Sequence, residues 1–168
     1  MSKVFFIADT HFGEDAIRRY ENRPFDSVEA MDRALMERWN AVVEPEDTVW
    51  HLGDLGGAGR EKELLAALHG RKRLVLGNHD TVGAAFYREV GFEEVYDLPV
   101  LFRGFWLLSH EPLYVNRNMP YANVFGHVHA NPQYADLSPQ HFCVCVERLD
   151  YTPMDFEELA RRVKEAAK

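Results

Sequence analysis

Short apolar runs rich in β-branched and aromatic residues recur along the chain, and each one ends in polar residues or glycine. Such runs predict strands with at least one buried face. We expect strands at residues 3–8, 48–52, 73–76, 94–101, 105–109, 122–126 and 141–149.

Helical periodicity separates the early strands. Asp26 is a suitable N-cap, with Glu29 three residues later, and the segment that follows has one apolar helical face. The residues expected on this face are Val28, Met31, Leu35, Trp39 and Val42.

Shorter helices are expected at 61–70 and 81–90, each ended by a glycine. A last helix begins near Thr152, the expected N-cap, and turns three apolar residues inward: Phe156, Leu159 and Val163. Helices and strands alternate in the first part of the chain, and strands dominate later. This order predicts an α/β sandwich in which helices cover the faces of sheets.

Length and composition narrow the class of protein. The 168 residues are most simply one domain spanning 1–168, and 46% hydrophobic with 27% charged residues is typical of a folded globular chain. The chain has neither an apolar run of about 18 residues nor a signal-peptide pattern, so we expect a soluble cytoplasmic protein that does not bind membranes. Cys143 and Cys145 lack CxxC spacing and are interpreted as reduced core residues.

The net charge of −8 makes the overall electrostatic field repel polyanions. Stable binding to duplex DNA is therefore not expected. A phosphate-bearing ligand would need local attraction, which acidic residues can provide indirectly by holding metal cations.

Polar residues follow five of the predicted strands directly. Because ligands bind beyond the carboxyl ends of strands in open α/β sheets, these five segments are expected to converge on one site. The candidate residues are Asp9, His11, Asp54, Asn78, His79, Asp80, His110, His127 and His129.

The side-chain chemistry of this set points to metals. Oxygen and imidazole ligands without thiolate suit manganese, iron, cobalt, nickel or catalytic zinc. Seven candidate ligands exceed what one ion needs, whereas two ions about 3.5 to 4 Å apart would use them all if one carboxylate bridged the pair. The i, i+2 pairs Asp9/His11 and His127/His129 are each expected to project from one side of an extended segment.

The motifs DTH, GD, GNHD, a lone histidine and GHVH occur in this order between residues 9 and 129. They resemble the calcineurin-like metallophosphoesterase superfamily, whose motifs run D-x-H, G-D, G-N-H-[D/E], H and G-H-x-H. Longer stretches such as DTHFG and GRKRLVLGNHD look like small stand-alone bacterial and phage members. The resemblance implies a four-layer αββα sandwich with two mixed sheets flanked by helices.

The resemblance also implies a ligand set and a reaction. One cation would be held by Asp9, His11, Asp54 and His129, and the other by Asp54, Asn78, His110 and His127, with Asp54 as the bridge. Manganese is the first expectation for the two divalent ions, with iron, zinc, nickel or cobalt as alternatives. The implied activity is hydrolysis of a small phosphate-ester substrate, a phosphodiester before a phosphomonoester, by attack of a metal-bridging hydroxide.

His79 and Asp80 have proposed catalytic roles. His79 diverges from its neighbour Asn78 and is assigned as general acid or as a donor to the phosphoryl group. Asp80 would hold the His79 imidazole in orientation. The simpler alternatives are a surface or capping histidine for His79, a turn residue for Asn78 and the N-cap of the next helix for Asp80.

Several charged residues have no assigned role. Glu14 stands where many similar sequences have histidine, so its part in the site is open. The arginines that could contact phosphate, or simply be solvated, are Arg18, Arg19, Arg23 and Arg117. The histidines outside the motifs, which we interpret as core or hydrogen-bonded residues, are His51, His69 and His141.

Two other functions are compatible with the same fold. A non-catalytic protein-binding scaffold would be expected to have lost ligands or His79, and this chain retains the full set. A nuclease would be expected to carry a basic face or added DNA-binding domains, which a 168-residue chain at −8 lacks, although short nucleic acids or cyclic nucleotides are still possible substrates.

Overall fold

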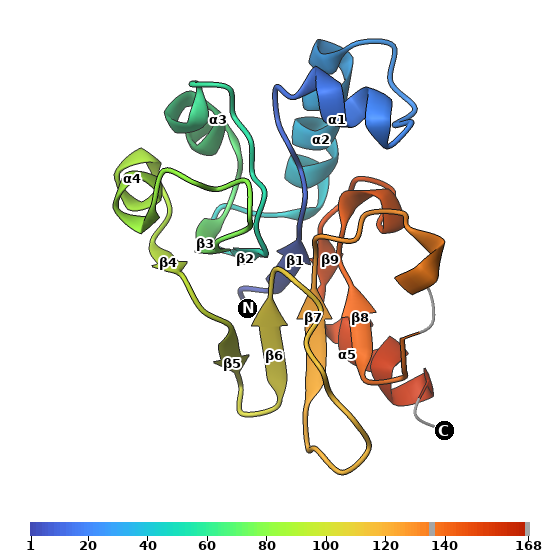
Figure 1. Ribbon diagram of the computed structural model, residues 1–168. Helices are drawn as coiled ribbons and strands as arrows, with labels where there is room; N and C mark the ends of the chain where they lie inside the picture. Colours follow the sequence, from blue (N-terminus) through green and yellow to red (C-terminus); the bar gives the residue numbers. More distant parts are fainter. Residues whose placement is uncertain (135–136, 167–168) are drawn as a thin grey trace.

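The computed structural model describes residues 1–134 and 137–166, and it contains two mixed β-sheets packed face to face with helices around them (Figure 1). This is the α/β architecture of two mixed sheets flanked by helices that the sequence predicts, and the prediction is confirmed. None of the described helices is long and apolar enough to cross a membrane.

The first sheet has the strand order β4-β3-β2-β1-β9, in which the first four strands are parallel and β9 is antiparallel to β1. Its strands are β1 (Val4–Ile7), β2 (Thr48–His51), β3 (Arg71–Val75), β4 (Glu94–Tyr96) and β9 (Met154–Asp155). β3 begins two residues before the strand predicted at 73–76 and so includes the basic residues 71–73, because their backbone pairs with β2 and β4.

Four helices lie on one face of the first sheet, above it in Figure 1. They are α1 (Asp15–Tyr20), α2 (Val28–Val42), α3 (Glu61–Ala67) and α4 (Ala84–Val90). Met31, Leu35 and Trp39 of α2 pack in the core beneath, as their spacing predicts. Two details of α2 were predicted wrongly. The N-cap is Ser27, whose hydroxyl accepts from the Ala30 amide, and Val42 is exposed while its neighbour Val43 is buried.

The second sheet has the order β5-β6-β7-β8, with β5 antiparallel to β6 and the other pairs parallel. Its strands are β5 (Val100–Phe102), β6 (Trp106–Ser109), β7 (Ala122–Phe125) and β8 (His141–Cys143). The single strand expected at 94–101 is therefore two strands in different sheets. The chain crosses from one sheet to the other at 97–99, where Pro99 cannot donate a backbone hydrogen bond.

The strand expected at 141–149 is also shorter than predicted. It ends at Cys143 and is followed by the 3-10 helix η2 (Val146–Arg148), because the chain bends there toward β1. A second 3-10 helix, η1 (Pro132–Tyr134), precedes β8.

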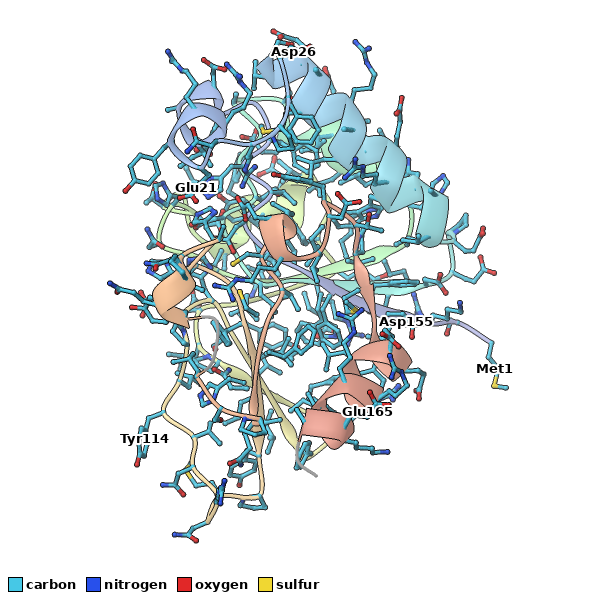
Figure 2. All side chains as sticks on the ribbon, turned by 90° about the vertical axis from the view of Figure 1, so that its right-hand side faces the viewer. Met1, Glu21, Asp26, Tyr114, Asp155 and Glu165 are labelled. Atoms are coloured by element: carbon cyan, nitrogen blue, oxygen red, sulfur yellow. The ribbon has the colours of Figure 1, made fainter. Side chains whose placement is uncertain are left out.

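Alternate strand residues of the two sheets form the core between them. Phe6, Trp50, Leu108 and Val124 meet in this layer. Helix α5 (Phe156–Ala166) closes the side of the sandwich along the edge strands β8 and β9, with Phe156, Leu159 and Val163 buried as predicted. Figure 2 labels Asp155 at its start. The Asp155 carboxylate accepts from the first amides of α5, so Asp155 is the cap and the predicted Thr152 is not.

The segment 111–121 has no regular secondary structure and returns the chain to the start of β7, since parallel neighbours need a crossover. It packs on the outer face of the second sheet, where Asn123 accepts from the Leu113 amide. Tyr114 extends from this segment into solvent (Figure 2).

Candidate metal centre

The predicted ligands come together at the carboxyl ends of strands from both sheets. Two groups of three have ligand atoms that all lie within 4.8 Å of one another. The first group is Asp9, His11 and His129, and the second is Asp54, His110 and His127. These groups match the division into two metal positions that the motif resemblance implies.

The first group is deeply buried and lacks hydrogen-bond partners at its centre. Asp9 and His11 are fully buried, and within the described residues neither Asp9 Oδ1 nor His11 Nε2 has a hydrogen-bond partner. His129 Nε2 lies 3.7 Å from the same Asp9 oxygen. Burial raises the pKa of Asp9 despite nearby histidines. A bound cation would satisfy these atoms and favour the ionised carboxylate.

The second group is more open and includes the predicted amide ligand. Asn78 Oδ1 lies 2.9 Å from His110 Nε2 and 2.9 Å from His127 Nδ1, and the two imidazole nitrogens are 3.2 Å apart. His127 and Asn78 are exposed, whereas His110 is buried. Three donor atoms spaced at about 3 Å fit around a cation with bonds of about 2.1 Å.

The Asp54 carboxylate lies between the two groups. Its Oδ2 is 3.7 Å from His11 Nε2 and 3.4 Å from His110 Nε2, and its Oδ1 accepts from the His79 amide at 2.9 Å. Burial acts to raise the pKa of Asp54, but His110, the His79 amide and His11 together outweigh it and lower this pKa to about 2. This carboxylate is therefore ionised and faces both groups, the position expected of a bridging ligand.

The ligand segments are not extended, contrary to the prediction for the i, i+2 pairs. Five predicted ligands have left-handed backbone: Asp9 (φ 59°), His11 (φ 49°), Asp54 (φ 58°), His127 (φ 69°) and His129 (φ 48°). Such angles are uncommon for residues other than glycine and cost roughly 1–3 kcal/mol each. The pairs reach a common centre because each member turns inward, not because alternate strand residues share a face.

Two motif glycines allow the segments to approach this closely. A Cβ atom on Gly126 would lie 2.5 Å from Asp9 Oδ2, and one on Gly77 would overlap Asp54 Oδ1. A side chain at either position would displace a predicted ligand.

Asp80 has a different structural role from the one predicted. Its Oδ2 accepts from the amides of Asp54 and Gly77, both at 2.8 Å, and its Oδ1 accepts from the Leu55 amide and the Tyr87 hydroxyl. None of its described hydrogen bonds reaches the His79 ring. It is not the N-cap of α4 either, since that helix begins at Ala84 after Gly83. Asp80 therefore ties the loop after β3 to the loop that carries Asp54.

His79 lies beside the first group with its imidazole exposed. Its ring centroid is 5.3 Å from that of His11, in an edge-to-face arrangement. Its backbone amide is held by Asp54, so the ring is directed by the loop and not by a carboxylate partner. An exposed imidazole next to the centre is suitably placed to contact a substrate oxygen.

Three predicted ligand histidines have an acceptor for the nitrogen that faces away from the centre. His11 Nδ1 contacts Glu14 Oε2 at 3.1 Å, His110 Nδ1 contacts the Leu52 carbonyl at 2.8 Å, and His129 Nδ1 contacts Glu147 Oε1 at 2.9 Å. The contact of Glu14 with His11 answers the question that the sequence left open. Sequence analysis missed Glu147, because no motif surrounds it and it follows β8 at a distance of eighteen residues from His129.

The arginines after the first motif are bound to other groups. Arg23 is buried, donates to the carbonyls of Asp9 and Thr10, and pairs with Glu147. Arg18 and Arg19 both pair with Asp15. Their described contacts are structural. Arg117 is exposed in the segment 111–121.

The histidines outside the motifs have the hydrogen-bonding roles expected of them. His51 lies under the centre, where its Nε2 and the Thr10 hydroxyl are 2.9 Å apart, and burial lowers its pKa to about 3, so the ring is neutral. His69 contacts the Val43 carbonyl, and His141 contacts Ser138 and the Leu113 carbonyl.

The two cysteines are free thiols, as predicted. Their sulfur atoms are 3.2 Å apart, and the buried Cys145 also donates to Asp9 Oδ2. This thiol therefore supports a predicted ligand from outside the centre.

A family model of calcineurin-like phosphoesterases matches residues 2–160 of the sequence. The chain belongs to the calcineurin-like phosphoesterase family. The activity class of this family is metal-dependent hydrolysis of phosphate esters, and the carboxylate, imidazole and amide donors described above fit divalent cations.

Three proteins similar to this calcineurin-like phosphoesterase carry names that state no activity. An uncharacterised protein of Methanocaldococcus jannaschii is 32% identical over 98% of this chain and 93% of its own length. The gene 66 protein of Mycobacterium phage L5 is 42% identical over 48% of this chain and 41% of its own length. The crystal structure of a protein of unknown function from Aquifex aeolicus is similar with a TM-score of 0.73 and 27% identity, covering 96% of this chain and 99% of that one.

Replacement of Asp80 tests its role as the tie between loops. Asp80→Ala leaves buried amides without acceptors and is expected to lower the free energy of unfolding by roughly 3 kcal/mol or more. Urea unfolding with a chelator present measures this without a contribution from metal. The control Asp97→Ala changes an exposed carboxylate and should shift stability by less than about 0.5 kcal/mol. Equal effects of the two substitutions would contradict this role.

The pH dependence of metal binding tests the charge of His110. Burial acts to lower its pKa, but Asp54 and Asp9 outweigh it and raise the pKa from 6.5 to about 9 in the metal-free protein. A metal requires the neutral ring, so affinity should rise by up to about tenfold per pH unit toward pH 9. The same shift stabilises the metal-free fold below about pH 6.5, and this stabilisation is lost as pH rises through about 9.

Calorimetry near neutral pH, in two buffers that differ in their heat of ionisation, measures this proton directly. Binding at the second group should release about one proton. An affinity that does not change with pH would show that His110 is already neutral.

Proposed function

We propose that this protein is a binuclear metallophosphoesterase that hydrolyses a small phosphodiester. The observation that carries the proposal is the Asp54 carboxylate, which faces His11 of one group and His110 of the other from a single oxygen. A carboxylate in this position can bind two cations at once and so bridge them.

The proposed ligand sets follow from the geometry. Asp9, His11 and His129 would hold one cation with Asp54, and Asn78, His110 and His127 would hold the other with Asp54. Bound divalent cations supply Lewis-acid chemistry: they lower the pKa of a water and neutralise phosphoryl oxygens. Manganese is the metal we favour, with iron, zinc, nickel or cobalt as alternatives, because the proposed ligands are oxygen and nitrogen atoms only.

Side chains of the protein would carry the proton transfer and the positioning that the reaction needs. His79 is exposed beside His11 and would donate a proton to the leaving oxygen. Asp80 acts indirectly, because its carboxylate positions the backbone amides of Asp54 and Leu55. The strained loops hold these groups in place before the substrate binds, which reduces the reorganisation required in the reaction.

The charges near the centre favour a diester over a monoester. A diester carries one negative charge at neutral pH, whereas a monoester carries up to two. Arg18, Arg19 and Arg23 are paired with carboxylates, and the chain as a whole has a net charge of −8. Apart from Arg148, which donates to the His129 carbonyl, positive charge near the centre would come mainly from the bound cations, which suits the less charged ester.

A groove beside Asn78 and His110 offers space for the organic part of the ester. Its lining includes the apolar residues Leu98, Pro99 and Leu113 and the carboxylates of Asp97 and Glu111. This lining suits a small phosphodiester of low charge better than long nucleic acid, and a short nucleotide would also fit the chemistry.

A metal-reconstitution assay tests the proposed activity. The protein is stripped with chelator, loaded with Mn²⁺, Zn²⁺, Ni²⁺ or Mg²⁺, and assayed on one aryl phosphodiester and one aryl phosphomonoester. We expect two cations per chain and faster turnover of the diester, with Mn²⁺ the best activator. Failure with every metal on both esters would favour a protein-binding scaffold of the same fold.

His79→Ala separates catalysis from metal binding. Because the backbone amide that holds Asp54 is retained, both cations should stay bound while kcat falls by roughly 10² or more. Asp54→Ala removes the bridge and should lose both metal and activity. Metal content by elemental analysis, measured with kcat on the same samples, distinguishes the two. Loss of metal from His79→Ala would show that His79 is a ligand.

A further inference from the structure

The acceptors behind the ligand histidines are distributed unequally between the two groups. In the first group, His11 contacts the Glu14 carboxylate at 3.1 Å and His129 contacts the Glu147 carboxylate at 2.9 Å. In the second group, His110 contacts the neutral carbonyl of Leu52 at 2.8 Å. For His127 the structure describes no carboxylate partner among residues 1–134 and 137–166, since its Nδ1 faces Asn78 and His110.

Glu147 is fixed more firmly than Glu14. The Arg23 guanidinium donates to its Oε1 from Nε at 2.9 Å and from Nη2 at 2.7 Å, and the two side chains are 0% and 5% exposed. The same guanidinium donates to the carbonyls of Asp9 and Thr10. The buried Arg23 guanidinium therefore holds both the loop of the first motif and the carboxylate behind His129.

These contacts determine which nitrogen of each histidine faces the centre. An Nδ1–H that donates to a carboxylate leaves Nε2 free to bind metal, and the negative charge makes the imidazole a better donor. Glu14 and Glu147 thus act on His11 and His129 without touching the cation. A backbone carbonyl also orients a ring, but it adds no net charge.

We propose that Glu14 and Glu147 are positioning residues that make the Asp9 position the tighter of two unequal metal positions, so that the first cation binds to Asp9, His11 and His129. The inference rests on the proposed binuclear centre and adds an order of binding to it. Loss of an outer carboxylate of this kind typically costs about 10- to 100-fold in metal affinity.

A competing interpretation is a third cation beside His129. Glu21, at the end of α1, has a ligand atom within 4.8 Å of atoms on His129 and Glu147. Figure 2 labels Glu21 below α1. Glu147 Oε2 is buried without a hydrogen-bond partner among the described residues and could serve such an ion, but the ion would have to replace the hydrogen bond between His129 Nδ1 and Glu147 Oε1. We therefore favour the positioning role, and the number of cations bound decides between the two.

Titration of the stripped full-length protein with Co²⁺ tests the proposal, with visible absorption and calorimetry as readouts. The unaltered protein should bind two ions in two resolved steps. Glu147→Gln and Glu14→Gln keep an amide oxygen behind each histidine but remove the charge. Each should weaken the tighter step by about 10- to 100-fold and leave the weaker step unchanged.

Glu21→Gln is the matched control, because it lies in the same cluster but has no described hydrogen bond to His129. It should leave both steps and the total of two ions unchanged. Three ions bound by the unaltered protein, with one lost in Glu21→Gln, would establish the competing site and overturn the proposal.

The remaining outcomes separate this inference from the proposed function. If the unaltered protein binds two ions and hydrolyses the diester, but the glutamine variants weaken both steps equally or neither, only the unequal positions are wrong. If it binds fewer than two ions, the binuclear centre itself fails. Glu14 is 32% exposed, so Glu14→Gln provides a folded variant even if Glu147→Gln unfolds, which thermal unfolding in chelator would reveal.

Discussion

The hydrogen bonds of the buried Asp80 carboxylate hold the predicted metal centre together. They connect the amide of Asp54, after β2, to the amide of Gly77, after β3, and the Tyr87 hydroxyl of α4 completes the set. Asp54 in turn faces His11 and His110, which come from different sheets. The position of the central carboxylate therefore depends on a neighbour that touches no cation.

The predicted metal centre costs the fold free energy, through backbone strain and through buried polar atoms. Five predicted ligands have left-handed backbone, and Asp9 and His11 have buried atoms without described hydrogen-bond partners. Such features persist only where the surrounding structure strongly determines them. The parallel strands below, with Phe6 and Leu108 among the buried residues between the sheets, provide that rigidity. Cations would recover part of the cost, which explains why a protein would keep this arrangement.

The two proposed metal positions share Asp54 but differ in the residues that support them. Carboxylates stand behind the histidines of the first group, and Arg23 secures one of them. The second group has a backbone carbonyl and an exposed amide as a predicted ligand, and it opens toward the groove beside Asn78 and His110. A buried position backed by carboxylates and an open one backed by a backbone carbonyl would suit different tasks: retention of a metal in the first, and exchange or substrate contact in the second.

The sequence by itself determined the class of fold, the strands that carry the ligands, and the side chains that meet at the centre, because each motif follows an apolar strand directly. Only the tertiary structure decided the role of Asp80, the partners of Glu14 and Glu147, and the division of 94–101 between two sheets. The reason is physical. Local patterns report how a residue sits in its own strand or helix. Asp80 meets Asp54 across 26 positions only when β2 and β3 pair, and Glu147 meets Arg23 across 124 positions only after the two sheets have packed.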